Sequence, residues 1–267
     1  MSLPSILVIR HRYPRVVRGV LELTLILTLW VGYSLSRLLA DTALTPALAR
    51  AHDLLHLERL LGIHWELPLN RLFTSHQAIG LLGSYWYASL HYVVTGATLL
   101  WLYKLGTRSY LPARRALVAG TLIGLVAYIL MPTAPPRFIT GYVDVLSLHA
   151  SDGWWSTDAS APRGLGGLTN ELAAFPSLHA GWALWVAISV QRNAAWRWVR
   201  ALAWVYAAGT AVVIVGTGNH WVIDVVVGWL VVLGGFAIAQ RMPRPLVPAA
   251  EPVDVVPLAG QPTATSG

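Results

Sequence analysis

A histidine and an aspartate stand four residues apart where a loop gives way to an apolar run. They are His220 and Asp224 in GTGNHWVID, residues 216–224. On a helix this spacing places both side chains on one face, within hydrogen-bonding reach. A carboxylate that accepts the proton of one ring nitrogen fixes the tautomer and leaves the lone pair of the other nitrogen free. The pair therefore predicts an oriented nucleophile.

A second histidine, His179, lies near the predicted start of another helix in FPSLHA, residues 175–180. Pro176 is suited to the first helical turn, and Ser177 and free backbone N–H groups lie beside the ring. Such a terminus attracts anions, and a phosphate dianion favours the protonated ring. We expect His179 to act as a general acid, although a lone histidine in such a place is more often packed or interfacial.

A cation comes from PTAPPRF, residues 132–138. Arg137 offers a planar fork of donors that fits phosphate oxygens, and the rigid Ala-Pro-Pro before it aims the side chain. The alternative is an arginine that only extends to the membrane interface. Together with the two histidines, it completes the groups needed for phosphoryl transfer through a covalent phosphohistidine, for which we expect no metal and no other cofactor.

The elements that carry these residues are apolar. The chain has 267 residues, is 55% hydrophobic and only 12% charged, and has a mean hydropathy of +0.56. These values predict an all-α membrane protein with a bundle of six transmembrane helices. Glu22, inside the first span, is suited to a hydrogen bond with another helix, and we assign it no catalytic role. The six predicted spans are 16–40, 79–103, 113–131, 176–190, 198–215 and 221–239.

The net charge is +7, and most of the basic residues that produce it lie in the connections between these spans. The Arg and Lys clusters at 10–18, 104–115, 192–200 and 241–244 occur at alternate connections, which predicts cytoplasmic termini and an active site facing outside. Spread over several loop ends, these charges do not form a nucleic-acid site. The composition is rich in arginine, with Lys104 the only lysine, and indicates a bacterial plasma membrane protein.

Two outer segments are longer than simple connectors. Residues 41–76 contain an amphipathic pattern that predicts a helix in the membrane interface or one packed on a partner. Residues 132–175 form a long outer loop of the kind that often carries function, and Trp154 and Trp155 are suited to anchor it among headgroups.

One membrane domain accounts for most of the chain. We expect a cytoplasmic segment at 1–15, the six-helix domain at 16–240, and a disordered cytoplasmic tail at 241–267. The tail is rich in Pro and Ala and lacks hydrophobic periodicity.

The motifs Pro-Ser-x-His at 176–179 and His-x-x-x-Asp at 220–224 resemble those of the type 2 phosphatidic acid phosphatase superfamily. The similarity covers about residues 45–240, and PTAPPR with TGNH resembles the inositolphosphotransferase-like branch related to fungal inositol phosphorylceramide synthases. The resemblance implies six membrane helices and lipid-phosphate substrates. It assigns His220 as nucleophile, Asp224 as its orienting partner, His179 as leaving-group acid, and Ser177 and Arg137 as phosphate contacts. Val213 and Ile214 stand where many members have Ser-Arg, so Asn219 and Thr217 are expected to assist Arg137.

The sequence therefore predicts an integral membrane lipid phosphatase or phosphotransferase that passes the phosphoryl group to water or to an alcohol. Its expected partner is a lipid with a phosphate headgroup; the sequence does not indicate which headgroup or which oligomeric state. A polytopic transporter with His179, His220 and Asp224 as a proton relay is the alternative, and a metal-dependent hydrolase is a weaker one. The polar residues gather at one face, which favours the enzyme.

Overall fold

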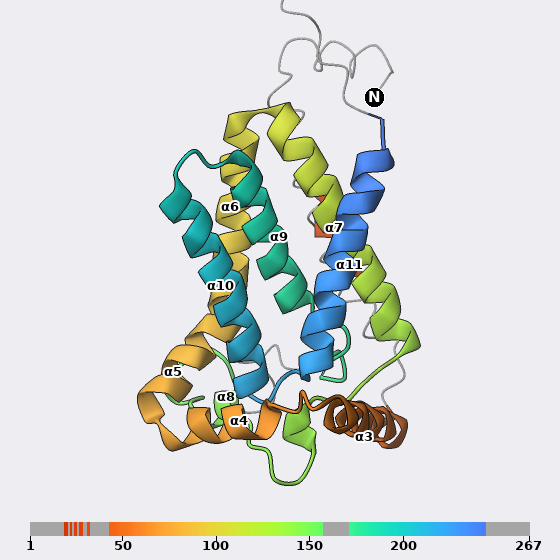
Figure 1. Ribbon diagram of the computed structural model, residues 1–267, viewed down its shortest axis with the longest axis vertical. Coiled ribbons are helices and arrows are strands. Elements are labelled where there is room, and N and C mark those ends of the chain that lie inside the picture. The colour runs from red at the N-terminus through yellow and green to blue at the C-terminus, as the bar shows by residue number, and fades with distance from the viewer. Residues whose placement is uncertain are drawn as a thin grey trace, which may run out of the picture.

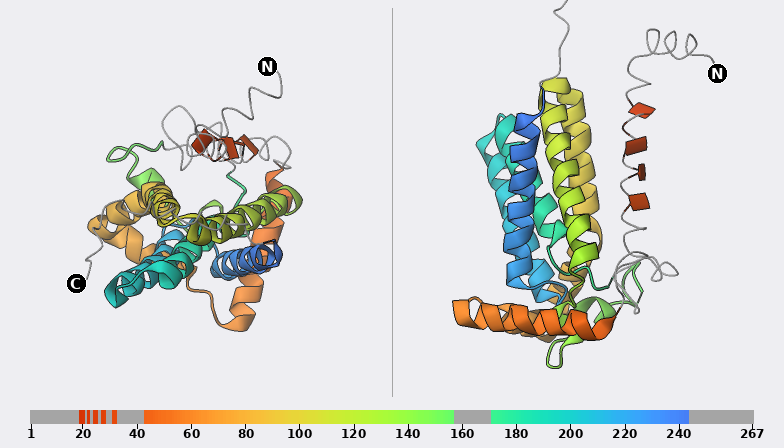
Figure 2. Two further views of the ribbon diagram at one scale, coloured as in Figure 1. Left: turned by 90° about the horizontal axis from the view of Figure 1, so that it is seen from above. Right: turned by 90° about the vertical axis from the view of Figure 1, so that its right-hand side faces the viewer.

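The computed structural model describes residues 43–156 and 171–243, together with a few helical positions between 19 and 32. Over these residues the elements are helices and turns, without strands. Most of the helices stand side by side in an upright bundle, and the first helices of the described chain, drawn in orange, lie across one end of it (Figures 1 and 2). The elements are α3 (Leu44–Leu61), α4 (Glu66–Ser75), α5 (Gln77–Tyr85), a π turn (Trp86–Leu90), α6 (His91–Leu105), α7 (Thr107–Leu130), a 3₁₀ turn (Pro136–Phe138), α8 (Val145–Leu148), α9 (Leu178–Asn193), α10 (Arg197–Gly216) and α11 (Val222–Arg241).

Three of these helices, α7, α10 and α11, are long and apolar enough to cross a membrane. Six spans are therefore not confirmed. The predicted span 79–103 is a continuous helical run that a π turn divides into α5 and α6, and neither part is among the three candidate spans. The helix α9 stands within the bundle but has 16 residues. The predicted span 16–40 falls largely outside the described residues.

Small residues let α11 approach its neighbours closely. A Cβ atom at Gly228 would lie 2.1 Å from the carbonyl oxygen of Ser177, and one at Gly235 would lie 2.4 Å from that of Ala116. Glycine at such positions allows helix backbones to approach within van der Waals contact. As a result the first turn of α11 lies against the start of α9, where the backbone N–H of Ser177 donates to the carbonyl of Asp224 at 2.9 Å.

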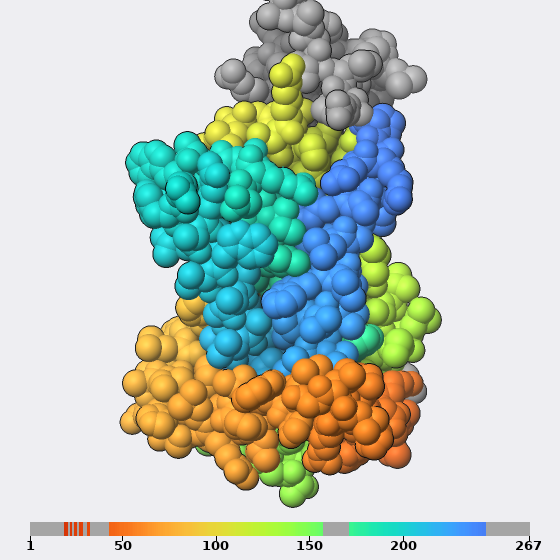
Figure 3. Space-filling model, viewed as in Figure 1, coloured from red at the N-terminus to blue at the C-terminus, as the bar shows by residue number. Residues whose placement is uncertain are grey.

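The helices α3 and α4 form a platform across the end of the bundle at which α10 ends and α11 begins (Figure 1). The predicted amphipathic helix in 41–76 is therefore present as α3. Its buried face consists of Ala47, Ala51, Leu55 and Glu58, which share one side of a helix. In the space-filling view the platform is a continuous layer below the bundle (Figure 3). Contact of this layer with lipid stays a prediction.

The described part of the long outer loop packs onto this end of the protein. Trp155 is 0% exposed and donates its indole N–H to the carbonyl of Leu146 at 2.8 Å. Its ring also meets Tyr85 edge to face. The expectation that Trp155 anchors the loop among headgroups is wrong, because this ring belongs to a small buried cluster. Trp154 is 39% exposed.

Glu22 connects the N-terminal helical positions to α7. Its carboxylate accepts hydrogen bonds from the hydroxyl of Tyr110, at 2.7 Å, and from Arg114. The expected hydrogen bond between helices is confirmed.

The contact at Gly228 yields a stability prediction. Gly228→Ala places a methyl group against the Ser177 backbone, so the helices must move apart, and we expect a loss of about 1–3 kcal/mol in unfolding free energy. Gly234→Ala is the matched control on the same helix, because a Cβ there meets nothing within 4 Å. Thermal unfolding of the purified protein measures both, and equal melting temperatures for the two variants contradict the close contact.

Candidate active site

The structure brings the three predicted motifs together at the platform end of the bundle. His179 lies in the first turn of α9, His220 lies between α10 and α11, and Arg137 lies in the 3₁₀ turn. The ring centroids of His179 and His220 are 5.6 Å apart, with the ring planes inclined by 59°. Side chains more than 40 residues apart in the sequence can therefore contact the same small group.

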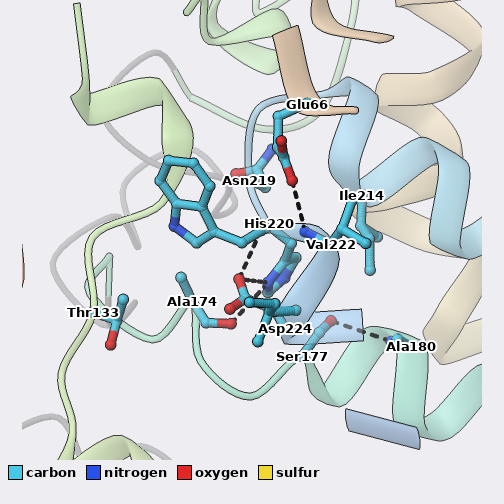
Figure 4. Close-up of polar contacts among 12 residues, drawn as sticks. Glu66, Thr133, Ala174, Ser177, Ala180, Ile214, Asn219, His220, Val222 and Asp224 are labelled. Atoms are coloured by element: carbon cyan, nitrogen blue, oxygen red, sulfur yellow. Dashed lines mark hydrogen bonds and ion pairs between the residues drawn. The ribbon is translucent and has the colours of Figure 1, made fainter. Parts of the chain in front are cut away.

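His220 is oriented mainly by a backbone carbonyl. Its Nδ1 atom lies 2.9 Å from the oxygen of Ala174 and 3.4 Å from Oδ2 of Asp224 (Figure 4). A carbonyl can only accept a hydrogen bond, so Nδ1 carries the proton and Nε2 keeps its lone pair. The predicted partner Asp224 is present, but Ala174 is the nearer acceptor.

Ala174 is held in place by a short pairing of two loop segments. Thr133 N donates to Leu172 O at 2.7 Å, and Ala174 N donates to Thr133 O at 3.3 Å. This pairing lays PTAPPR beside the segment that leads into α9, and it directs the Ala174 carbonyl at His220. Sequence reasoning missed this acceptor because a backbone carbonyl has no signature in residue type.

Asp224 has a second task in the first turn of α11. Its Oδ2 atom accepts the backbone N–H of Trp221 at 2.8 Å, and its own carbonyl accepts the N–H of Ser177. The carboxylate thus satisfies an N–H group that would otherwise be orphaned at the helix start. Asp224 therefore contacts His220 and also connects the start of α11 with the start of α9.

The electrostatic surroundings keep His220 neutral. Burial lowers the pKa of His220 to about 3; the hydrogen bond to Ala174 opposes this shift, and the nearby charge of Arg137 adds to it. The imidazole is therefore unprotonated at neutral pH, and a free ring nitrogen is what nucleophilic attack requires.

Arg137 is held by a short chain of polar side chains. Its guanidinium donates to Oδ1 of Asn219 and lies 3.4 Å from the carboxylate of Asp144. The amide of Asn219 in turn donates to the Thr217 hydroxyl at 3.1 Å, and that hydroxyl donates to the Ile214 carbonyl. Thr217 and Asn219 thus support Arg137, and direct contact of either with phosphate stays a prediction.

Ser177 is the N-cap of α9. Its hydroxyl accepts the backbone N–H of Ala180 at 3.2 Å, and the residue is 0% exposed. Its contact with phosphate stays a prediction. Ile214 stands at one of the two positions where many superfamily members have Ser-Arg. Its backbone carbonyl accepts the backbone N–H of His220 at 3.1 Å.

Two further rings surround His179, and the π turn positions both of them. Tyr87 stacks on His179 with centroids 4.5 Å apart, and His91 meets it edge-on at 4.2 Å. Nδ1 of His91 donates to the Tyr87 carbonyl at 2.9 Å. A π turn changes which residues share a helix face, and such turns are frequent at functional sites. His91 can be singled out in the sequence, but the π turn that orients it cannot be predicted from residue types.

Two acids of the platform also reach the site. Glu58 and Glu66 accept backbone N–H groups of α11 and are 0% exposed. A signal for Glu58 exists in the sequence, because it shares its helix face with Ala47 and Leu55. Among the residues that the structure describes, no group of three or more His, Cys, Asp or Glu side chains is arranged to hold a metal ion.

A family model described as the PAP2 superfamily matches residues 52–238 of the chain. Neither the curated proteins nor the solved structures give a match. The matched range includes both histidine motifs, Arg137 and the two platform acids. Members of this superfamily are phosphatases and phosphotransferases that act on phosphate-containing lipids. Because the match spans more than half of the chain, the protein belongs to the PAP2 superfamily, and this membership supports an enzyme of the phosphatase type.

Proposed function

We propose that the protein is an integral membrane lipid phosphatase or phosphotransferase that works through a phosphohistidine on His220. The observation behind this proposal is the 2.9 Å distance from Nδ1 of His220 to the Ala174 carbonyl oxygen, which leaves Nε2 free, with the centroid of the His179 ring 5.6 Å from that of His220. The family match and the gathering of His179, His220 and Arg137 at one end of the bundle favour this enzyme over a proton-relay transporter.

In the first step, Nε2 of His220 attacks the phosphorus of a lipid phosphate or phosphodiester headgroup. The bond from phosphorus to the leaving oxygen breaks, and that oxygen keeps the electron pair and takes a proton from His179, which gains this proton when the anionic headgroup binds beside it. Arg137 binds non-bridging oxygens and offsets the developing negative charge. The imidazole becomes positive when phosphorylated, and the Asp224 carboxylate at 3.4 Å stabilises that charge.

In the second step, neutral His179 removes a proton from water or an alcohol, and the resulting oxygen nucleophile attacks the phosphorus. The nitrogen–phosphorus bond breaks, and its electron pair returns to Nε2 of His220. Water as acceptor makes the protein a phosphatase, and an alcohol makes it a transferase. The likeness of PTAPPR and TGNH to the inositolphosphotransferase-like branch supports the alcohol, whereas water is the simpler acceptor.

We further propose one membrane domain at 16–240 in a bacterial plasma membrane, with both termini in the cytoplasm and the platform outside. Support comes from the positions of the basic residues. The connections α6–α7 and α9–α10 and the end of α11 lie at the end of the bundle away from the platform (Figure 1). The basic residues at these places are Lys104, Arg108, Arg192, Arg197, Arg200 and Arg241.

This orientation can be tested with single cysteines, because the chain contains none. Asp152 lies in the outer loop and Ala195 lies between α9 and α10, and both are exposed. In intact cells, a membrane-impermeant maleimide should label Asp152→Cys and spare Ala195→Cys until the cells are lysed. Labelling of Ala195→Cys alone places the active site on the cytoplasmic side.

The assignment of His179 can be tested through the leaving group. A lipid alcohol needs a proton to depart, whereas a nitrophenolate hardly does. His179→Ala should therefore lose about 10²-fold or more in kcat/KM on a dialkylglycerol phosphate and recover most of that loss on nitrophenyl phosphate.

His220→Ala is the matched control, because a nucleophile is required whatever group leaves. It should be equally inactive on both substrates. Equal losses for His179→Ala on the two substrates contradict the role of general acid, and a role for this ring in binding phosphate then replaces it.

A further inference from the structure

The first turn of α11 takes hydrogen-bond acceptors from two other helices. The N–H of Val222 donates to Oε1 of Glu66 in α4 at 2.9 Å, and the N–H of Ile223 donates to Oε1 of Glu58 in α3 at 2.8 Å (Figure 4 shows the first of these). The N–H before them is capped by Asp224 itself. A helix start leaves its first N–H groups without partners in the helix, so these three carboxyl groups complete it.

The remaining oxygens of the three acids are buried. Oε2 of Glu58, Oε2 of Glu66 and Oδ1 of Asp224 accept no hydrogen bond from the side chains and backbone that the structure describes. Three neighbouring carboxylates without counter-charges are costly to bury, and the cost falls when one of them is protonated. The pKa of Glu58 is raised from 4.5 to about 9, first by burial and next by its interaction with Glu66. A proton on Glu58 gives this carboxyl group a donor toward the neighbouring Glu66, and so accounts for two of the three unpartnered oxygens.

The other titratable groups around the pair come from three sides. Asp224 lies on α11, and Tyr142 approaches from the outer loop, where burial raises its pKa to about 12, with Glu66 and Glu58 adding to the shift. Arg59 of α3 lies near enough to Tyr142 to oppose that shift. Tyr142 therefore stays neutral up to strongly alkaline pH and does not titrate in the range in which Glu58 loses its proton.

We propose that Glu58 and Glu66 are positioning residues: their carboxyl groups hold the first turn of α11, and through it His220 and Asp224. Val222 and Ile223 follow His220 directly along the chain, so a shift of this turn changes the distances from His220 to Ala174 and Asp224. A displacement of about 1 Å in a catalytic group can cost about 10²-fold in rate. The kinetic consequence of this inference rests on the proposed function, whereas its consequence for stability does not.

The kinetic test uses two substitutions of Glu58. Glu58→Gln keeps the length, the acceptor for Ile223 and a donor toward Glu66, so kcat on dialkylglycerol phosphate should stay within about threefold of wild type. Glu58→Asp keeps the carboxyl group but is one methylene shorter, so it cannot reach both partners. We expect kcat to fall by about tenfold or more with little change in KM. Asp53→Asn is the matched control, an exposed acid on the same helix that should behave as wild type.

The stability test needs no activity. Since the folded-state pKa of Glu58 is raised from 4.5 to about 9, the folded protein binds more protons than the unfolded chain between these values. The stabilisation from this proton is complete below about pH 4.5 and is lost as pH rises to about 9. The melting temperature of the full chain in detergent should therefore fall as the pH is raised from 6 to 9. In Glu58→Gln, which has no such proton to lose, the fall over the same range should be smaller than in wild type by at least about 3 °C. Asp53→Asn should follow wild type.

The outcomes separate this inference from the proposed function. If Glu58→Asp keeps the kcat of Glu58→Gln, the pair does not position the site. If wild type and Glu58→Gln lose melting temperature equally with pH, the pair holds no proton and the inference is overturned. If wild type does not turn over the lipid phosphate, the proposed function fails, and the melting curves alone then decide whether the pair exists.

Discussion

The need to satisfy the backbone N–H groups at the start of α11 determines much of the architecture around the site. A helix that begins inside an apolar assembly cannot leave these groups to water, so acceptors must be built into the protein. Asp224, Glu66 and Glu58 supply them, and the last two draw α4 and α3 across the end of the bundle. Ser177 donates to the same turn from α9, because Gly228 leaves room for its backbone.

This arrangement also limits the negative charge that a phosphate meets. Acids buried beside a nucleophile would repel an anionic substrate, which the proposed reaction must avoid. Burial keeps His220 neutral and keeps a proton on Glu58, so the site retains a free ring nitrogen and fewer full charges. Arg137, held by Asn219 and Asp144, then provides the positive charge that attracts the phosphate. Glu58 thus supports the start of α11 and, by carrying a proton, also reduces the negative charge near the site.

The positions of the two histidine motifs could be predicted because each stands where an apolar run meets a loop, and that boundary fixes depth in a helical bundle. The helix α3 could be predicted for a different reason, because its apolar residues recur at the spacing of one helix face. The backbone acceptor for His220 could not be predicted, since it depends on the pairing of Thr133 with the segment around Ala174. The π turn that aims Tyr87 and His91 has no local signature, and it divides a span that hydropathy alone treats as one. The place of Trp155 could not be predicted either, because an aromatic residue in a loop can pack in a buried cluster as well as at a membrane interface.

The location of the transferred phosphoryl group is the most direct measure of this account. The protein is mixed with a dialkylglycerol phosphate labelled in the phosphate, quenched in base to preserve phosphoramidates, and analysed by mass spectrometry with the two phosphohistidine isomers resolved. Because Ala174 holds the proton on Nδ1, the account predicts label on Nε2 of His220 and none in His220→Ala. Label on His179, on Nδ1 of His220, or on no histidine of a protein that turns over its substrate contradicts it.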